Sequence, residues 1–176
     1  MEKTKKLKKT IERIWNVLFC GTGGQGVLTA SEICAVAAMN AGYHVKKSEV
    51  HGMAQRGGSV ESHLRFGTMV FSPLIQPVGA DYVVCFHEGE GQRMNFYLKK
   101  GGLSFLTFLT DPQCQPQDKR FGNTFFLGML SAFLPMTEDT WRAALKKQLK
   151  RALVENEQAF GDGRRAGFSW RGRQKT

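Results

Sequence analysis

Six residues after the first apolar run have the spacing of a phosphate-binding turn. They are Gly21, Thr22, Gly23, Gly24, Gln25 and Gly26. They follow apolar residues 17–20 and precede a second apolar segment at 27–41, so a strand, a glycine turn and a helix would aim backbone N–H groups at an anion. Glycines adopt positive φ angles and carry no Cβ, which allows a ligand close to the backbone. The spacing indicates a phosphate-bearing ligand, and it equally fits a tight turn that only lets strand and helix pack closely.

Residues 48–58 form a second stretch with chemical potential. It contains His51, Gln55, Arg56, Gly57 and Gly58, and it shows neither a helical nor a strand period, which indicates a loop. An imidazole can move a proton near neutral pH, and an arginine can bind a carboxylate or phosphate through two hydrogen bonds. A glutamine amide can hydrogen-bond a substrate or cofactor. The alternative for these three side chains is that they fasten the loop and bind a partner subunit.

A nicotinamide dinucleotide site would need an acidic residue at the end of the second strand, roughly 20 residues beyond the turn. The expected second strand, 43–45, runs into Lys46 and Lys47, and Glu49 lies beyond its expected end. The sequence therefore argues against a nicotinamide dinucleotide bound in the usual way.

The elements around these residues follow an α/β pattern. Unbroken apolar runs at 16–20 and 80–86 predict buried strands of a parallel sheet, and 103–109 predicts a further strand. Residues 60–66 alternate, and Gly67-Thr68 predicts a two-residue turn into a strand at 69–71. Helices are expected at 27–41 (ending at Gly42), after the strand at 80–86, at 123–134 and after the N-cap Thr137. The predicted fold is a three-layer Rossmann-like α/β domain whose mixed sheet contains a β-hairpin.

The net charge of +10 is concentrated at the two ends of the 176-residue chain. Residues 1–13 carry six basic and two acidic side chains, and residues 161–176 carry five basic and one acidic. We expect basic tails at 1–15 and 161–176, the second without regular structure, around a single domain at 16–160. Neither tail has the aromatic interleaving or reading helix of a nucleic-acid binder, so we predict no nucleic acid and consider an acidic protein partner instead.

Compositional signals for membranes and metals are also weak. No apolar run approaches the ~18–20 residues of a membrane span, and the basic start lacks the features of a signal peptide, so we expect a cytoplasmic protein without membrane contact. The four cysteines (Cys20, Cys34, Cys85 and Cys114) form no C-x-x-C pair. We therefore predict no metal site and read the cysteines as reduced core residues.

The two motifs together resemble the gamma-type domain of 2-oxoacid:ferredoxin oxidoreductases. Residues 21–28 read Gly-Thr-Gly-Gly-Gln-Gly-Val-Leu at the head of a strand–helix unit. Residues 48–60 read Ser-Glu-Val-His-Gly-Met-Ala-Gln-Arg-Gly-Gly-Ser-Val and closely resemble the form in the beta subunit of indolepyruvate ferredoxin oxidoreductase. The resemblance runs from about residue 16 to 134, and more weakly to 163.

The resemblance implies a subunit of a two-chain enzyme that is active only with its partner. The reaction would be oxidative decarboxylation of an aryl pyruvate, here indolepyruvate, with coenzyme A as cosubstrate and ferredoxin as electron acceptor. The larger partner would carry thiamine diphosphate and 4Fe–4S clusters, and this chain neither. Residues 21–26, Gly57 and Gly58 would then hold a phosphate of coenzyme A or complete a wall of the thiamine site, and His51, Gln55 and Arg56 would be catalytic.

The sequence departs from the family in two places. The family usually has several dozen residues, including a strand and a helix, where only the short 107–122 region stands here, and Gly89 and Gly91 replace helix formers. Two alternatives follow: a stand-alone nucleotide- or coenzyme A-binding module, and a vestigial regulatory paralogue that assembles with the partner but does not restore turnover.

Overall fold

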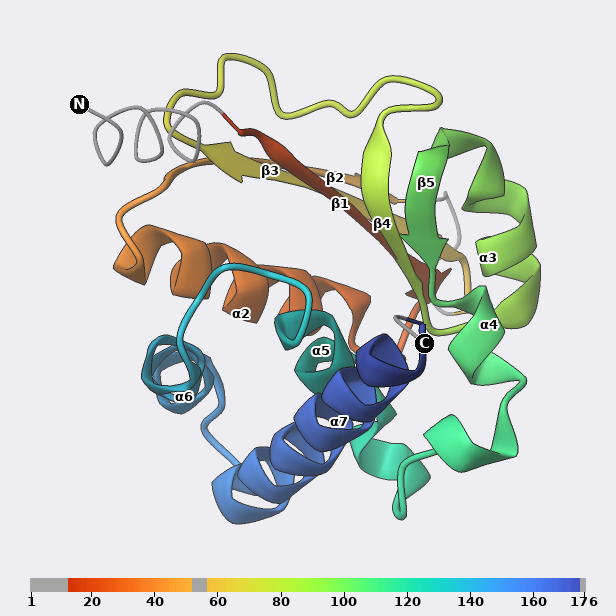
Figure 1. Cartoon of the computed structure of the whole chain (residues 1–176), viewed down its shortest axis with the longest axis vertical. Coiled ribbons are helices and arrows are strands. Elements are labelled where there is room, and N and C mark those ends of the chain that lie inside the picture. The colour runs from red at the N-terminus through yellow and green to blue at the C-terminus, as the bar shows by residue number, and fades with distance from the viewer. Residues whose placement is uncertain (1–12, 52–56, 175–176) are drawn as a thin grey trace.

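A mixed five-stranded sheet forms the centre of the molecule (Figure 1). The computed structural model describes residues 13–51 and 57–174. The strands are β1 (Trp15–Thr22), β2 (His44–His51), β3 (Ser59–Gly67), β4 (Ala80–Cys85) and β5 (Leu98–Ser104). Their order is β2-β3-β1-β4-β5, and β3 is antiparallel to both of its neighbours while β1, β4 and β5 run parallel. The predicted α/β class with a mixed sheet is confirmed.

The hairpin of this sheet lies one strand earlier than predicted. It joins β2 and β3, and the predicted strand at 69–71 is absent from the sheet. Because β3 already pairs with β1 on one side and β2 on the other, it has no free edge for a strand after Gly67. Met69 and Phe71 lie instead in an exposed connection, at 58% and 85% exposure.

The last strand also differs from its prediction. β5 covers Leu98–Ser104, and the apolar run after it forms the short helix α4 (Leu106–Leu109). Phe105 and Phe108 are both fully buried, and their spacing of three residues is helical rather than strand-like. The predicted strand at 103–109 is therefore wrong beyond Ser104, where the apolar residues follow the period of a helix.

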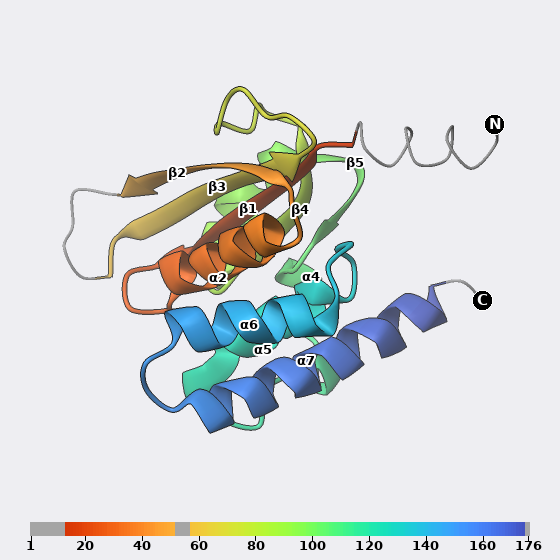
Figure 2. The same cartoon turned by 90° about the vertical axis from the view of Figure 1, so that its left-hand side faces the viewer.

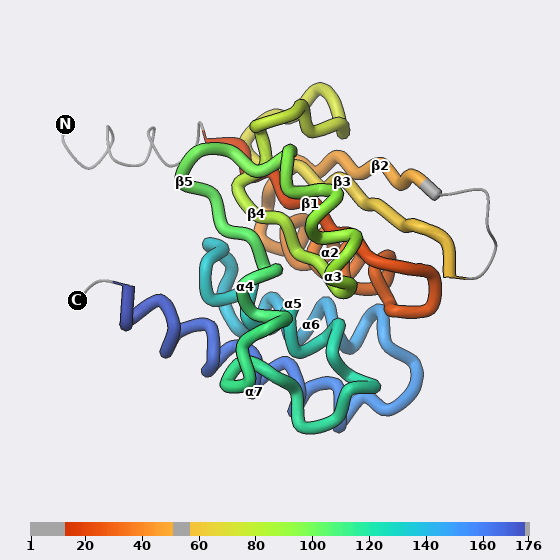
Figure 3. Tube along the Cα trace, turned by 90° about the vertical axis from the view of Figure 1, so that its right-hand side faces the viewer, coloured from red at the N-terminus to blue at the C-terminus, as the bar shows by residue number. Residues whose placement is uncertain are grey.

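Helices cover both faces of the sheet. They are α2 (Val27–Asn40), α3 (Glu88–Met94), α4, α5 (Gly122–Ser131), α6 (Glu138–Gln148) and α7 (Leu153–Arg173), with 3-10 turns at Asn95–Tyr97, Pro112–Cys114 and Lys119–Phe121. Figure 2 shows α2 directly under the sheet and α5, α6 and α7 beneath it. On the other face α3 contacts β1 and β4 (Figure 3).

The predicted ends of two helices are confirmed by their hydrogen bonds. At the end of α2, the N–H of Gly42 donates to the oxygen of Met39 (2.9 Å) and that of Tyr43 to Ala38 (3.1 Å), as in a Schellman motif. At the start of α6, the side chain of Thr137 accepts from the N–H of Thr140. Trp141 and Leu145 are fully buried on this helix, as its amphipathic pattern predicts.

The expectation of an unstructured end after residue 160 is wrong. Residues 161–173 continue α7, which packs along α5. The two backbones touch at glycines: a Cβ on Gly163 would lie 1.9 Å from the oxygen of Phe125, and one on Gly128 would lie 2.1 Å from that of Phe160. The charged residues of this segment suggest a solvated tail, but its G-x-x-x-G spacing, Gly163 to Gly167, lets the helix approach α5 closely.

Among the described residues, the model contains no helix with the length and apolarity needed to span a bilayer.

Candidate functional site

The carboxyl ends of the parallel strands form the edge at which the sequence motifs meet. The chain leaves β1 through the glycine turn into α2 on one face, and leaves β4 into α3 on the other. Between β1 and β4 the connections thus diverge, which is a topological switch point, where open α/β sheets bind ligands. The glycine turn after β1 and Phe86 after β4 lie on the two sides of this point.

The two glycine motifs are in direct contact. The N–H of Gly23 donates to the oxygen of Gly58 (2.9 Å), and Thr22 and Ser59 are register partners in the sheet. A Cβ on Gly23 would lie 3.3 Å from the backbone nitrogen of Gly57, while Gly23 itself is exposed. The structure therefore brings the glycine turn together with Gly57 and Gly58, while their binding of a cofactor stays a prediction.

Gln25 fixes the shape of the turn through both ends of its amide. Its Oε1 accepts from the N–H of Thr22 (2.8 Å), and its Nε2 donates to the oxygen of Phe86 (2.9 Å). The side chain thus ties the end of β1 to the end of β4. Its predicted part in cofactor binding stays a prediction, and Gln25 also lines the cavity described below.

The first turn of α2 presents backbone donors. Its N-cap, Gly26, has a φ of 77° and gives no side-chain cap, and no acidic residue lies in the first turn. A Cβ on Gly26 would lie 2.3 Å from Nδ2 of Asn123, so α5 packs against this N-cap. The N-terminal end of α2 therefore keeps its partial positive charge uncompensated by side chains of that turn.

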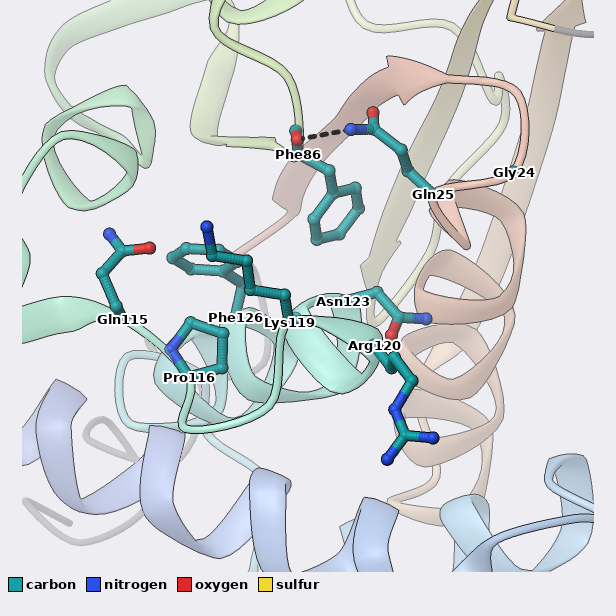
Figure 4. Close-up of a pocket in the computed structure, with 10 residues that line it drawn as sticks. Gly24, Gln25, Phe86, Gln115, Pro116, Lys119, Arg120, Asn123 and Phe126 are labelled. Carbon is teal, nitrogen blue, oxygen red and sulfur yellow. Dashed lines mark hydrogen bonds between the residues drawn. The ribbon is translucent and has the colours of Figure 1, made fainter.

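A cavity of about 400 Å³ opens beside this turn (Figure 4). Its walls come from the turn, from the end of β4, from the segment before α5 and from α5 itself. They are Gly24, Gln25, Phe86, Gln115, Pro116, Lys119, Arg120, Gly122, Asn123 and Phe126. The volume is within the ~300–1,000 Å³ of small-molecule sites.

Arg93 of α3 links that helix to the start of β3. Its guanidinium lies 2.9 Å from a Glu61 oxygen and 2.7 Å from a Glu90 oxygen, and it also donates to Ser59 Oγ. His63 and then Arg93 hold the pKa of Glu61 below its usual value, although burial opposes them. Because Ser59 follows Gly58, this network fixes the edge against which the glycine turn rests.

The three predicted catalytic residues are only partly described. His51 is the last residue of β2 and pairs in register with Val60. Gln55 and Arg56 lie outside the described residues, as does the His51 side chain, so their roles stay predictions. Glu49, expected beyond the end of the second strand, lies inside β2 beside Lys47 (2.8 Å).

Sequence reasoning missed the cavity wall contributed by residues 115–126. Lys119, Asn123 and Phe126 stand more than 90 positions after the glycine turn, and the loop before α5 carried no motif. The basic pair Lys119-Arg120 just before a helix was the only available signal.

The four cysteines are buried and unpaired thiols. Burial raises the pKa of Cys85 to about 12 and, with the help of Asp111, that of Cys114 to about 11. Burial also strongly raises the pKa values of Cys20 and Cys34. Within residues 13–51 and 57–174, no group of three or more His, Cys, Asp or Glu side chains is arranged to hold a metal ion.

A sequence profile for pyruvate ferredoxin/flavodoxin oxidoreductases matches residues 16–119. The chain belongs to this family. The "Indolepyruvate oxidoreductase subunit IorB" of Thermococcus kodakarensis is 44% identical over 101 residues, covering 57% of this chain and 50% of that protein. The protein of the same name from Archaeoglobus fulgidus is 50% identical over 91 residues, covering 52% and 45%. The chain thus spans about half the length of these curated relatives.

Solved structures of oxidoreductase-family proteins share the fold. The gamma subunit of a keto/oxoacid ferredoxin oxidoreductase from Geobacter sulfurreducens superposes with a TM-score of 0.69, at 21% identity, over 88% of this chain and 99% of that one. A 2-oxoglutarate:ferredoxin oxidoreductase from Magnetococcus marinus, solved with 2-oxoglutarate, coenzyme A and succinyl-CoA bound, gives 0.70 at 18% identity over 90% of this chain and 32% of that one.

Proposed function

We propose that this chain is the cluster-free subunit of a thiamine-diphosphate-dependent 2-oxoacid:ferredoxin oxidoreductase that acts on indolepyruvate. The observation that carries the proposal is the contact between Gly23 and Gly58 at the switch point of the sheet. It joins the two motifs by which the chain resembles its relatives, and both lie at an exposed edge where a second chain has access. The curated relatives named for indolepyruvate support the choice of substrate.

In this proposal the glycine turn binds the phosphates of coenzyme A. The first turn of α2 has no side-chain cap, so its N–H groups suit an anion. Gly24 has a φ of 98° and no atom within 4 Å of the position a Cβ would take, which leaves space for a ligand against the backbone. This chain's part in the reaction is to bind and orient the cosubstrate and to exclude water.

The reactive groups are assigned to a larger partner subunit. Thiamine diphosphate held by that subunit would supply the electron sink needed for decarboxylation, and its 4Fe–4S clusters would carry electrons to ferredoxin. His51, at the end of β2, and Gln55 and Arg56, which follow it in the chain, are proposed to reach the 2-oxoacid. We expect the assembly to be cytoplasmic.

Co-expression with a larger thiamine- and cluster-bearing chain tests the proposal. We expect the two chains to purify together and to reduce ferredoxin in a reaction that needs both indolepyruvate and coenzyme A. Assembly without turnover would favour a vestigial regulatory paralogue, since the 107–122 region is short. Failure to associate at any ratio would contradict the proposal and leave a stand-alone ligand-binding module.

A further inference from the structure

A second cavity, of about 350 Å³, lies at the edge of the sheet opposite the glycine turn. Its walls come from Arg13 just before β1, from the start of β4, from β5, from the connection after α5 and from the end of α7. Because β1 and β4 are parallel, their starts lie at one edge of the sheet and the glycine turn at the other. Figure 2 likewise shows the C-terminal end of α7 on the side of the molecule where β1 begins.

Strand β5 bulges where it borders this cavity. While β4 advances by two paired residues, β5 advances from residue 98 to residue 103. The bulge contains Gly101, with a φ of 76°, and Gly102, on which a Cβ would lie 3.0 Å from the oxygen of Asp81. It begins with Lys99, whose ammonium donates to the carboxylate of Asp81. Bulges are common beside functional sites, where they redirect a side chain.

Arg13 and Lys99 give the cavity wall an excess of positive charge. Both cations contact the same oxygen, Oδ1 of Asp81, with Nη2 of Arg13 at 3.5 Å. Asp81 is only 4% exposed, and its other oxygen accepts from the N–H of Asn16 (2.8 Å). One aspartate therefore holds two cations side by side, balances one of their charges and uses only part of their N–H donors.

Three half-buried aromatic side chains form the apolar part of the wall. The ring of Phe133 lies 6.1 Å from that of Tyr82 and 5.9 Å from that of Trp170. Burial and then Asp81 raise the pKa of Tyr82, so its hydroxyl stays protonated at neutral pH and donates to the oxygen of Phe133 (3.3 Å). This part of the wall thus offers ring surface without a negative charge.

The charged and aromatic parts of the wall meet at Arg13. Its guanidinium lies 3.5 Å from the ring centroid of Trp15, and that ring stacks on Tyr82 at 6.3 Å. A ligand that carries an acid group beside a ring can therefore contact both parts at once.

We infer that this cavity binds a small aromatic carboxylate, with its ring against Tyr82, Phe133 and Trp170 and its carboxylate paired with Arg13 and Lys99. Guanidinium and ammonium groups bind a carboxylate through charge-assisted hydrogen bonds, and aromatic surface favours a ring over an aliphatic chain. The volume is within the ~300–1,000 Å³ of small-molecule sites. The end of α7 then has a function besides packing on α5, because it supplies Trp170.

The test is calorimetric titration of the 176-residue chain with naphthylacetate as the probe. Acetate and naphthylethanol, titrated separately, represent the anion without the ring and the ring without the charge. We expect naphthylacetate to bind about tenfold or more tightly than either, and added salt to weaken its binding. Equal affinity for acetate or for naphthylethanol, or no binding at millimolar naphthylacetate, would overturn the inference.

Two variants that remove a charge connect the binding to the cavity. Lys99→Gln and Arg13→Gln should each weaken naphthylacetate binding by about threefold to tenfold. Lys100→Gln, the same change at an exposed neighbour outside the cavity wall, should leave it unchanged. Arg13 is 52% exposed, so its variant remains informative if Lys99→Gln, which removes a partner of the buried Asp81, fails to fold. Equal affinities of Arg13→Gln and Lys100→Gln would overturn the inference.

The indole of Trp170 reports where the ligand binds. Naphthylacetate should shift the NMR signal of the Trp170 indole N–H, assigned with the Trp170→Phe variant, and leave that of Trp141, fully buried in α6, in place. An unchanged Trp170 signal at saturating ligand would overturn the inference. Because the chain is used without a partner and the glycine turn lies at the other edge of the sheet, this result is independent of the proposed function.

Discussion

Val78 holds a backbone conformation that does not suit a β-branched residue. Its φ is 59°, and it follows Pro77 in a turn closed by the N–H of Gly79 on the oxygen of Gln76 (3.0 Å). A positive φ at the third position of a Pro-containing turn normally requires glycine or asparagine. The side chain is 63% exposed, so packing offsets little of the cost.

Replacement of Val78 by glycine should therefore stabilise the protein by about 1 kcal/mol. The gain is measured as a higher free energy of unfolding in urea. Val154→Gly, a similarly exposed valine in α7 without positive φ, should instead destabilise it. A loss of stability in Val78→Gly would show that the valine side chain contributes a contact that its exposure does not suggest.

The network around Arg93 predicts a specific dependence on pH. Burial would raise the pKa of Glu90, but hydrogen bonds from Arg93 and Ser59 hold it below its usual value of 4.5; His63 with Arg93 likewise lowers the pKa of Glu61 against burial. A carboxylate whose pKa is lower in the folded state stabilises the fold above its unfolded pKa, and this contribution disappears as the pH falls through the folded pKa.

Arg93→Gln should thus cost about 0.5–1 kcal/mol at pH 7, with allowance for the partial exposure of Arg93, and less at pH 3. Urea unfolding at both pH values measures the difference. Arg142→Gln, which breaks the surface pair with Glu138 on α6, is the control and should cost less at pH 7. An equal cost of Arg93→Gln at the two pH values would contradict the assigned ionisation.

Sequence alone could predict those site residues whose role depends on the backbone. The glycine turn and Gly57-Gly58 could be selected because glycine spacing limits the local conformation; the structure brings them into contact, and their part in binding stays a prediction. The cavity wall formed by residues 115–126 could not be predicted, because the packing of α5 against Gly26 is what brings this segment beside the turn. The hydrogen bond from Gln25 to the oxygen of Phe86 could not be predicted either, because it depends on the end of the neighbouring strand β4.

At the scale of elements, the contact between α5 and α7 is the strongest packing constraint. Gly163 and Gly167 of α7 lie one helical turn apart and face the backbone of α5. Long apolar runs bounded by glycine or polar residues, such as α2 and β4, were predicted within about two residues. Helix α7 was not predicted, because its many glycines and arginines leave no continuous apolar face in the sequence. Its stability comes from its close approach to α5.

Gly163→Ala should therefore destabilise the protein by roughly 2–4 kcal/mol, because the new Cβ would overlap the oxygen of Phe125. Gly172→Ala is the matched control. A Cβ there meets no atom within 4 Å, so helix propensity should make it neutral or slightly stabilising. Thermal unfolding of both variants measures the contrast. Similar melting temperatures would mean that α7 does not pack on α5 in solution.

At the scale of the whole molecule, the insertion of β3 between β1 and β2 explains the absent dinucleotide signature. In a dinucleotide fold the second strand pairs with the first, and its terminal carboxylate reaches the ribose. Here β3 separates the two strands, so β2 is about 10 Å from β1 instead of about 5 Å. Glu49 on β2 pairs with Lys47, and the edge next to the glycine turn is formed by Gly57 and Gly58.

The strand order could not be predicted from one sequence, because β3 could form a hairpin either with the preceding strand or with the 69–71 segment. In the structure β3 pairs with β2 on one side and β1 on the other, which leaves no edge for 69–71. The order brings Gly57 and Gly58, which directly precede β3, to the same edge as the glycine turn. The site is therefore a property of the assembled sheet, although each motif was visible alone.

The most direct test of the account is the kinetics of the two-chain enzyme with Gly23→Val in this subunit. The valine side chain would press on Gly57 and occupy the exposed edge of the turn, so the KM for coenzyme A should rise by about tenfold or more while the KM for indolepyruvate stays nearly constant. Gly172→Val, at an open position of α7, should change neither value. Unchanged kinetics for Gly23→Val in an intact complex would contradict the claim that the paired glycine edges form the cosubstrate site.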